Sequence, residues 1–273
     1  MFKECLENLR KQSPLIHCMT NYVTVNDVAN ALLAIGGSPI MSDDEAEVEE
    51  ITSICNGLDL NIGTLNQRTI ASMLKAGKKA SSLHHPILLD PVGAGASKLR
   101  TKTAVSILES VDVKVIRGNV SELKALALGS TTTKGVDASS LDAITDDNLE
   151  KMITIFKDYA QKTKAIIAVT GAIDLVSDGK RCFVIRNGVK EMSRITGTGC
   201  MLSGMLPAFI CANPDHLLEA CASGVIAMGL AGEMGKSYLA SYEGNASLRT
   251  RIIDALMVMT PEELEEGAKY ELY

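Results

Sequence analysis

A glycine-rich turn near residue 200 has the composition of an anion-binding site. In the segment Arg194-Ile-Thr-Gly-Thr-Gly-Cys200, two glycines flank a threonine directly before a long apolar run. If that run is a helix, its first backbone N–H groups lack partners, and the helix dipole places about half a positive charge there. Gly197, Thr198 and Gly199 could then cradle a phosphoryl group at close range. The same spacing is equally typical of an ordinary glycine-rich helix entry.

Cys200 occupies the first turn of that predicted helix. The dipole is expected to lower the pKa of its thiol below the usual value of about 8.5, which makes Cys200 a candidate base or nucleophile. The other six cysteines are predicted to be buried structural residues, since free cysteine is among the most often buried residue types. All seven are scattered, without a C-x-x-C pair or histidines at zinc spacing, which is typical of a reducing cytosol.

A second polar group, Arg117-Gly-Asn-Val-Ser-Glu122, directly follows the strand-like run Val113 to Ile116. Ligands of parallel sheets collect beyond the C-terminal ends of the strands, so these side chains are expected to face a binding crevice. Arg117 could bind a nucleotide phosphate, while Asn119 and Glu122 could hold magnesium-bound water. Alternatively, Asn119 or Ser121 caps a helix that begins here, and Glu122 closes a capping box.

Two further groups end predicted strands in the same way. Asp90-Pro-Val-Gly-Ala-Gly95 offers a carboxylate with glycines, and Thr170-Gly171 offers a hydroxyl and a backbone N–H for a nucleotide phosphate or ribose. Loops at this edge of a sheet are where α/β enzymes place their functional residues. No G-x-x-x-x-G-K-S/T motif occurs, so an ATP site would be built from groups such as these.

Near the N-terminus, Asn21-Tyr-Val-Thr-Val-Asn26 and Ser38-Pro-Ile-Met41 also follow or end predicted strands. Their mixture of amide, apolar and thioether groups suits a small, mostly apolar ligand with one or two polar handles. Met41 is equally typical of a residue that fills a gap in the core.

The elements that must position these groups alternate along the chain, which predicts βαβ units around a parallel sheet with helices on both faces. Three strands without intervening helices follow, the last two joined at the turn Asp178-Gly179. The remainder is predicted to be helical, and no linker, charge block or repeat interrupts residues 1–273, so a single domain is expected. The predicted strand and helix runs are Leu15–Met19, Asn26–Ile35, Ser38–Met41, Glu45–Cys55, Leu58–Ile62, Gln67–Lys79, Ile87–Leu89, Lys102–Leu108, Val113–Ile116, Ser121–Leu126, Ala165–Val169, Leu175–Ser177, Cys182–Ile185, Cys200–Ala212, His216–Lys236, Ser247–Met259 and Pro261–Ala268.

Composition excludes several classes of partner. A net charge of -6 argues against a protein that coats nucleic acid or an anionic membrane, and 4% aromatic residues without tryptophan argue against a stacking surface for single strands. The N-terminus has no apolar core of signal-peptide length, which favours the cytoplasm. The apolar stretch Leu217–Gly232 contains Glu219 and is short for a membrane span, so it is predicted to be a buried helix.

Taken together, the motifs resemble the hydroxyethylthiazole kinase family of the ribokinase-like superfamily, in order from about Leu15 to Gly232. The segments that carry the resemblance are Thr20–Asn26, Ser38–Met41, Leu60–Leu65, Asp90–Gly95, Arg117–Glu122 and Gly197–Cys200. The resemblance implies phosphorylation of 4-methyl-5-(2-hydroxyethyl)thiazole by ATP with Mg²⁺, a step of thiamine salvage and biosynthesis. It also implies a ribokinase-like three-layer fold and a homotrimer with active sites at subunit interfaces.

Carried over to the matching positions, the resemblance implies three sets of site residues. The thiazole is expected at Met41 and Gly197, with Asn21, Val23 and Gly63 as further candidates; ATP is expected at Arg117, Thr170 and Asn119; Mg²⁺ is expected at Asp90 and Glu122. The acidic segment Ser42-Asp-Asp-Glu45 departs from the alanine-rich stretch typical of the family, which puts the affinity for the substrate in question.

Many ribokinase-like enzymes have aspartate where this chain has Cys200. Because phosphoryl transfer has a loose transition state, positioning and charge stabilisation matter more than a strong base, and Cys200 is expected to assist only modestly. The alternatives are a kinase for hydroxymethylpyrimidine or a sugar, a non-catalytic nucleotide-binding regulator, and a thiol acyl transferase. The last of these lacks an identifiable histidine base.

Overall fold

A computed structural model describes residues 1–129 and 143–273. Within these residues, nine strands form one sheet in the order β2-β1-β3-β4-β5-β6-β7-β8-β9. The pairs from β2 through β6 are parallel, and the pairs from β6 through β9 are antiparallel. The strands are β1 (Leu15–Met19), β2 (Ser38–Ile40), β3 (Gly57–Asn61), β4 (Ile87–Asp90), β5 (Val115–Asn119), β6 (Ile166–Thr170), β7 (Asp174–Ser177), β8 (Cys182–Ile185) and β9 (Tyr270–Leu272).

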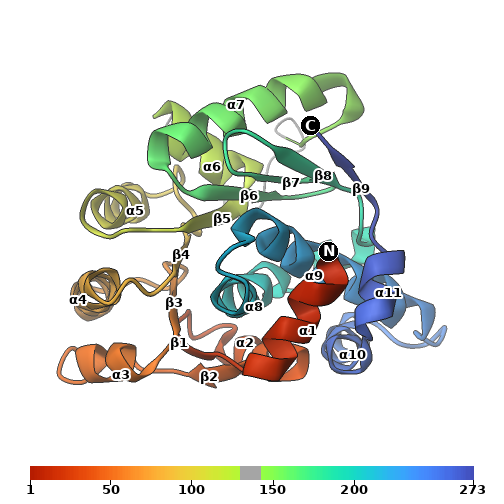
Figure 1. Ribbon diagram of the computed structural model, residues 1–273, viewed down its shortest axis with the longest axis horizontal. Coiled ribbons are helices and arrows are strands. Elements are labelled where there is room, and N and C mark those ends of the chain that lie inside the picture. The colour runs from red at the N-terminus through yellow and green to blue at the C-terminus, as the bar shows by residue number, and fades with distance from the viewer. Residues whose placement is uncertain (130–142) are drawn as a thin grey trace.

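Helices cover both faces of the sheet, so the molecule has three layers (Figure 1). One face carries α1 (Phe2–Gln12), α2 (Val25–Ile35), α8 (Thr198–Ala212), α9 (Leu217–Ser237), α10 (Asn245–Val258) and α11 (Pro261–Glu266). The other carries α3 (Val48–Ile54), α4 (Gln67–Ser82), α5 (Lys98–Ser110), α6 (Val120–Leu128) and α7 (Leu149–Thr163). Two short 3-10 helices, η1 (Asp146–Asn148) and η2 (Lys190–Arg194), join these elements. The predicted mostly parallel α/β sandwich is confirmed.

The sheet divides the apolar core into two clusters. One lies between the sheet and the face that holds α8 and α9, and the other lies beneath the helices from α3 to α7. Strands β1, β3, β4 and β6 are buried along almost their whole length, which explains why their sequences are nearly continuous in apolar residues. α9 is long and apolar enough to cross a membrane, but 83% of its most apolar window is buried, so it is a core helix as predicted.

The predicted hairpin at Asp178-Gly179 is present. Gly179 has a positive φ of 89°, and the Asp178 carboxylate accepts the backbone N–H groups of Lys180 and Arg181. The turn therefore uses glycine for its backbone conformation and aspartate for its hydrogen bonds.

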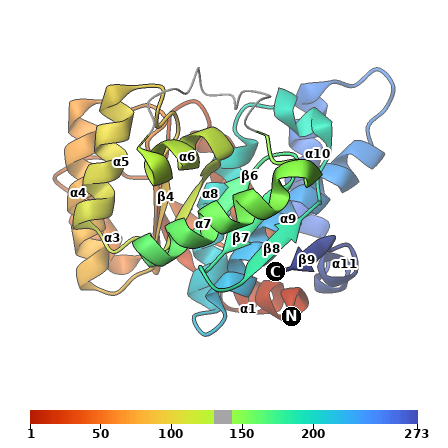
Figure 2. The same cartoon turned by 90° about the horizontal axis from the view of Figure 1, so that it is seen from above.

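The expectation that the chain is helical from residue 200 to its end is wrong at the C-terminus. After α11, residues Tyr270–Leu272 form β9, which pairs with β8 and completes the sheet (Figure 2). The strand is short and exposed, so it lacks the apolar pattern by which a strand is predicted from sequence. Two helices, α1 and α7, also lie outside the predicted elements.

Candidate active site

The predicted site residues meet where the C-terminal ends of the central strands face the first turn of α8. Asp90 is the last residue of β4 and pairs in register with Asn61 of β3, while Asn119 of β5 pairs with Thr170 of β6. Four neighbouring strands therefore present polar side chains at one edge of the sheet. This arrangement is the one expected of a ligand site in a parallel α/β sheet.

The first turn of α8 is open to a ligand. Gly197 precedes the helix with a positive φ of 95°, and no side chain caps the helix. A Cβ atom on Gly197 would lie 2.6 Å from Cγ2 of Thr24, and one on Gly199 would lie 2.6 Å from Nη2 of Arg117. Gly197 is favoured by its positive φ and by Thr24, whereas a side chain on Gly199 would displace the guanidinium group of Arg117, which lies directly against the start of the helix.

Arg117 joins the α8 start to the strand ends. Its guanidinium group donates to the hydroxyl of Thr170, and Nη1 lies 3.5 Å from Oδ2 of Asp90. The side chain is 11% exposed, and Nε has no protein partner. A cation whose Nε has no protein partner therefore lies beside a helix start that no side chain caps, and the two together favour an anion.

Asp90 is fully buried, and its two carboxylate oxygens have different surroundings. Oδ2 accepts hydrogen bonds from Nδ2 of Asn61 at 2.7 Å and from Oγ of Ser203 at 2.8 Å, whereas Oδ1 has no partner. Burial raises the pKa of Asp90, although Arg117 opposes this shift. One oxygen is therefore held in place and the other is available to a ligand.

The alternative of a capping box at Asn119 and Glu122 is realised. Oδ1 of Asn119 accepts the backbone N–H of Glu122, and Oε2 of Glu122 accepts that of Asn119, each at 2.9 Å. Oε1 of Glu122 accepts the N–H of Gly93 at 2.8 Å, which ties the loop after β4 to α6. Burial, followed by the charge of Asp90, raises the pKa of Glu122 to about 7. Each oxygen accepts one N–H group and so retains a lone pair.

Cys200, in the first turn of α8, faces two asparagines, Asn21 and Asn61. Its Sγ accepts hydrogen bonds from Nδ2 of Asn21 at 3.2 Å and from Nδ2 of Asn61 at 3.4 Å. The expected depression of its pKa is wrong. Burial, followed by the negative charge of Asp90, raises the pKa of the thiol above its ordinary value, although Thr24, Arg117 and Asn21 oppose the shift.

A cavity of about 260 Å³ lies at the ends of β1 and β3. Met41, which the resemblance places at the thiazole, lines it together with Met19, Met73 and the polar side chains of Asn61 and Thr64. Ser42 and Asp43 of the acidic segment also line it. Part of the segment that departs from the family pattern is therefore at the wall of the cavity.

The remaining predicted substrate residues divide into two groups. Asn21 and Gly63 lie beside Asn61, whose Oδ1 accepts from both Nδ2 of Asn21 and the N–H of Gly63. Val23 is 58% exposed and does not line the cavity.

Several residues of the site were not predicted individually. Asn61 contacts Asp90, Asn21 and Cys200, and its signal was its place at the end of a predicted strand. Ser203 lies inside α8, and nothing in its sequence surroundings indicates its hydrogen bond to Asp90. Asp174, with its carboxylate on the N–H of Gly171, lies beside the predicted ATP residues and was also missed.

The fold is ribokinase-like: the ribokinase-like superfamily protein from Enterococcus faecalis superposes with a TM-score of 0.63 at 13% identity, covering 97% of this chain and 95% of that one. The model of the hydroxyethylthiazole kinase family matches residues 6–262. The hydroxyethylthiazole kinase of Clostridium acetobutylicum is 56% identical over 273 residues, which is all of both chains. The solved structure of the hydroxyethylthiazole kinase protein of Pyrococcus horikoshii OT3 has a TM-score of 0.88 at 35% identity, covering 100% of this chain and 98% of that one.

The chain therefore belongs to the hydroxyethylthiazole kinase family, whose members are phosphotransferases of thiamine biosynthesis.

Proposed function

We propose that this protein transfers the γ-phosphoryl group of ATP to the hydroxyl of 4-methyl-5-(2-hydroxyethyl)thiazole. One observation carries the proposal: the first turn of α8, which has no capping side chain, lies against Arg117, and Arg117 lies 3.5 Å from the carboxylate of Asp90, whose other oxygen has no partner, next to a cavity lined by methionines. An anion site and an apolar site thus adjoin, as transfer of phosphate to a mostly apolar alcohol requires.

The phosphates of ATP are assigned to the side of the site where positive charge gathers. Arg117 and Thr170, already hydrogen-bonded to each other, would bind phosphate oxygens, with Asn119 at the end of the neighbouring strand. The N–H groups of Thr198, Gly199 and Cys200 would stabilise charge on the transferring group, because preorganised donors cost little reorganisation during the reaction.

Asp90 and Glu122 fit a magnesium site of the kind that relies on substrate phosphates. Oδ1 of Asp90 is buried without a partner, and Glu122 retains lone pairs. Within residues 1–129 and 143–273, no cluster of three or more His, Cys, Asp or Glu side chains could hold a metal by itself. Mg²⁺ bound here with ATP would neutralise phosphate charge. Asn61 and Ser203 would hold Asp90 in position.

The alcohol is assigned to the cavity at Met41, with its hydroxyl directed towards Cys200 and Gly197. Asn21 and Asn61 hold the sulfur of Cys200 in a fixed position. Because its pKa is raised, the thiol keeps its proton at neutral pH, so it orients the alcohol by hydrogen bonding, and the proton of the alcohol passes to an oxygen of the transferred phosphoryl group. Cys200 therefore assists modestly.

Residues at the mouth of the cavity support a homotrimer with shared active sites. Tyr22 lines the cavity yet is 79% exposed, and the neighbouring Val23 is 58% exposed. A second copy packed on these residues would enclose the alcohol and place Val23 at the site. Analytical ultracentrifugation of the wild type and of a Val23→Asp variant tests the assembly. We further assign residues 1–273 to one domain. We also assign the protein to the cytoplasm.

The decisive experiment measures ADP release from Mg-ATP with a panel of hydroxyethylthiazole, hydroxymethylpyrimidine and ribose. Turnover of the thiazole at a kcat/KM about a hundredfold above the other alcohols supports the proposal. Preference for the pyrimidine or the sugar would assign a different substrate to the same site. Binding of ATP without turnover of any alcohol would indicate a regulator instead.

A further inference from the structure

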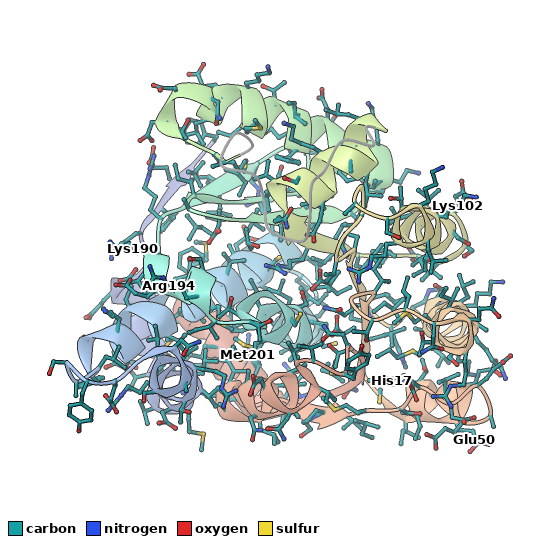
Figure 3. The ribbon with its side chains drawn as sticks, turned by 180° about the vertical axis from the view of Figure 1, so that it is seen from behind. His17, Glu50, Lys102, Lys190, Arg194 and Met201 are labelled. Atoms are coloured by element: carbon teal, nitrogen blue, oxygen red, sulfur yellow. The ribbon has the colours of Figure 1, made fainter. Side chains whose placement is uncertain are left out.

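His17 is a buried polar residue behind the cavity wall that the reaction as described does not use. It lies on β1 with no exposed surface (Figure 3). Its side chain faces the segment that follows β2, where Nε2 lies 2.9 Å from the backbone carbonyl of Ser42. Nδ1 lies 3.0 Å from the hydroxyl of Thr52 on α3. The imidazole thus bridges one helix and one loop.

The partners of the ring determine its tautomer. A carbonyl oxygen only accepts, so Nε2 carries the hydrogen and donates it to Ser42. The hydroxyl of Thr52 has a single hydrogen, which can be donated to Nδ1 or to the carbonyl of Val48 at 2.6 Å. Burial lowers the pKa of His17, which keeps the ring neutral and the tautomer unchanged near neutral pH.

The segment held by His17 is the wall of the cavity. Met41, Ser42 and Asp43 all line the cavity, and residues 41–44 have no regular secondary structure. They follow β2, which is a three-residue edge strand. The hydroxyl of Ser42 donates to Glu47 at 2.6 Å, but that bond stays within the same loop. The bond from His17 anchors this loop to the central sheet.

We propose that His17 is a positioning residue for the alcohol substrate, which sets the place of the Met41–Asp43 wall by donating from Nε2 to the carbonyl of Ser42. The inference rests on the proposed function, because it takes the cavity at Met41 to be the alcohol site. Loss of the donor leaves the buried carbonyl of Ser42 without a partner, and the loop moves to satisfy it. The phosphate-binding residues are on other strands and keep their places.

The test compares variants that differ in where they present an N–H group. His17→Leu removes the donor, His17→Asn presents its amide near the position of Nδ1, and His17→Gln presents it near the position of Nε2. We expect the KM for the alcohol to rise about tenfold in the Leu and Asn variants and to stay within about twofold of wild type in the Gln variant. In all three, kcat and the KM for ATP should change less than about twofold.

A general loss of structure would raise both KM values together, so an equal rise for ATP would overturn the inference, as would an unchanged alcohol KM in the Leu and Asn variants. Equal impairment of Gln and Leu would also contradict it. Thr52→Val is the matched control, because it removes the partner of Nδ1 and leaves the bond to Ser42; it should remain within about twofold of wild type.

A second measurement does not depend on the substrate. Amide hydrogen exchange over residues 43–47 should be about tenfold faster in His17→Leu than in wild type and restored in His17→Gln. Absence of turnover by the wild type would refute the proposed function, whereas unchanged exchange in His17→Leu would refute the role of His17. The two failures are therefore distinguishable.

Discussion

The two halves of the site are built differently. The phosphate half consists of buried side chains that hold one another, as in the contacts of Asp90 with Asn61, Ser203 and Arg117. The alcohol half has a wall without regular structure and a mouth where Tyr22 is 79% exposed. Under the proposed function, charge stabilisation would rest on side chains of one chain, whereas enclosure of the alcohol would depend on this loop and on the proposed second subunit.

The largest effect is expected from breaking the phosphate half at Asp90. Asp90→Asn removes the negative charge beside the phosphates and should lower kcat/KM by about a thousandfold, measured by steady-state kinetics. Asp59→Asn is the matched control, since Asp59 is a fully buried carboxylate on the neighbouring strand β3 and neither of its oxygens has a partner. Comparable loss in both variants would show that the effect is not specific to the site.

The next largest effect is expected from Gly199→Ala, which tests whether the start of α8 and Arg117 act together. In Gly199→Ala the new methyl group displaces the guanidinium group from Thr170 and Asp90, so kcat/KM should fall about a hundredfold. Arg117→Ala should chiefly raise the KM for ATP. Gly171→Ala serves as the control, because the nearest atom to its Cβ would be 3.8 Å away. Wild-type kinetics in Gly199→Ala would contradict the contact.

The third effect concerns the stability that the protein loses by burying the carboxylate of Asp174 beside the phosphate half. Burial raises the pKa of Asp174 to about 7, so the folded state binds this proton more tightly than the unfolded chain does. The resulting stabilisation is fully present below pH ~4 and is lost as the pH rises to ~7. Asp174→Asn should therefore raise the free energy of unfolding by on the order of 2 kcal/mol at pH 8 and change it little at pH 4. Urea denaturation at both pH values measures this, and an equal change at both would disprove it.

A smaller effect is expected in the alcohol half. Met41→Ala removes apolar contact with the thiazole and should raise the KM for the alcohol about tenfold, with the KM for ATP unchanged. A rise in the KM for ATP of similar size would show that the two halves are not separate.

The smallest effect is expected at Cys200, where the halves meet. Cys200→Ala should retain more than about a tenth of the wild-type kcat, and Cys200→Asp should be at least as active as wild type. Because the pKa of the thiol is raised, activity that required a thiolate would increase steeply above pH ~9 in wild type alone. Rate profiles of wild type and Cys200→Ala with the same shape are expected, and complete loss of turnover in a folded variant would refute the modest role.

The fold was largely predictable because the signals that specify it are local. Buried parallel strands produce continuous apolar runs, and Asp178-Gly179 specifies its turn within a few residues. β9 was not predictable, since three exposed residues become a strand only through the edge that β8 offers them. Its structure depends on a partner distant in the sequence.

The site was predictable to the extent that its residues end strands. Asp90 and Arg117 lie close together because β4 and β5 are parallel neighbours, which the alternation of elements predicts. The contact of Ser203 depends on how α8 lies across β4, and the raised pKa of Cys200 depends on burial and on the charge of Asp90. Neither property is encoded in spacing along the chain.

The first and last helices of the described residues meet, because α1 packs against α11 and the amino group of Met1 lies 3.2 Å from the carboxylate of Glu265 (Figure 2). Phe2, Leu6 and Leu9 of α1 are fully buried in the finished protein. During synthesis this helix must therefore wait on the order of tens of seconds, at typical elongation rates, before its last packing partner leaves the ribosome. Part of its apolar face therefore stays uncovered until α11 has been made, although α8 and α9 can cover the rest earlier.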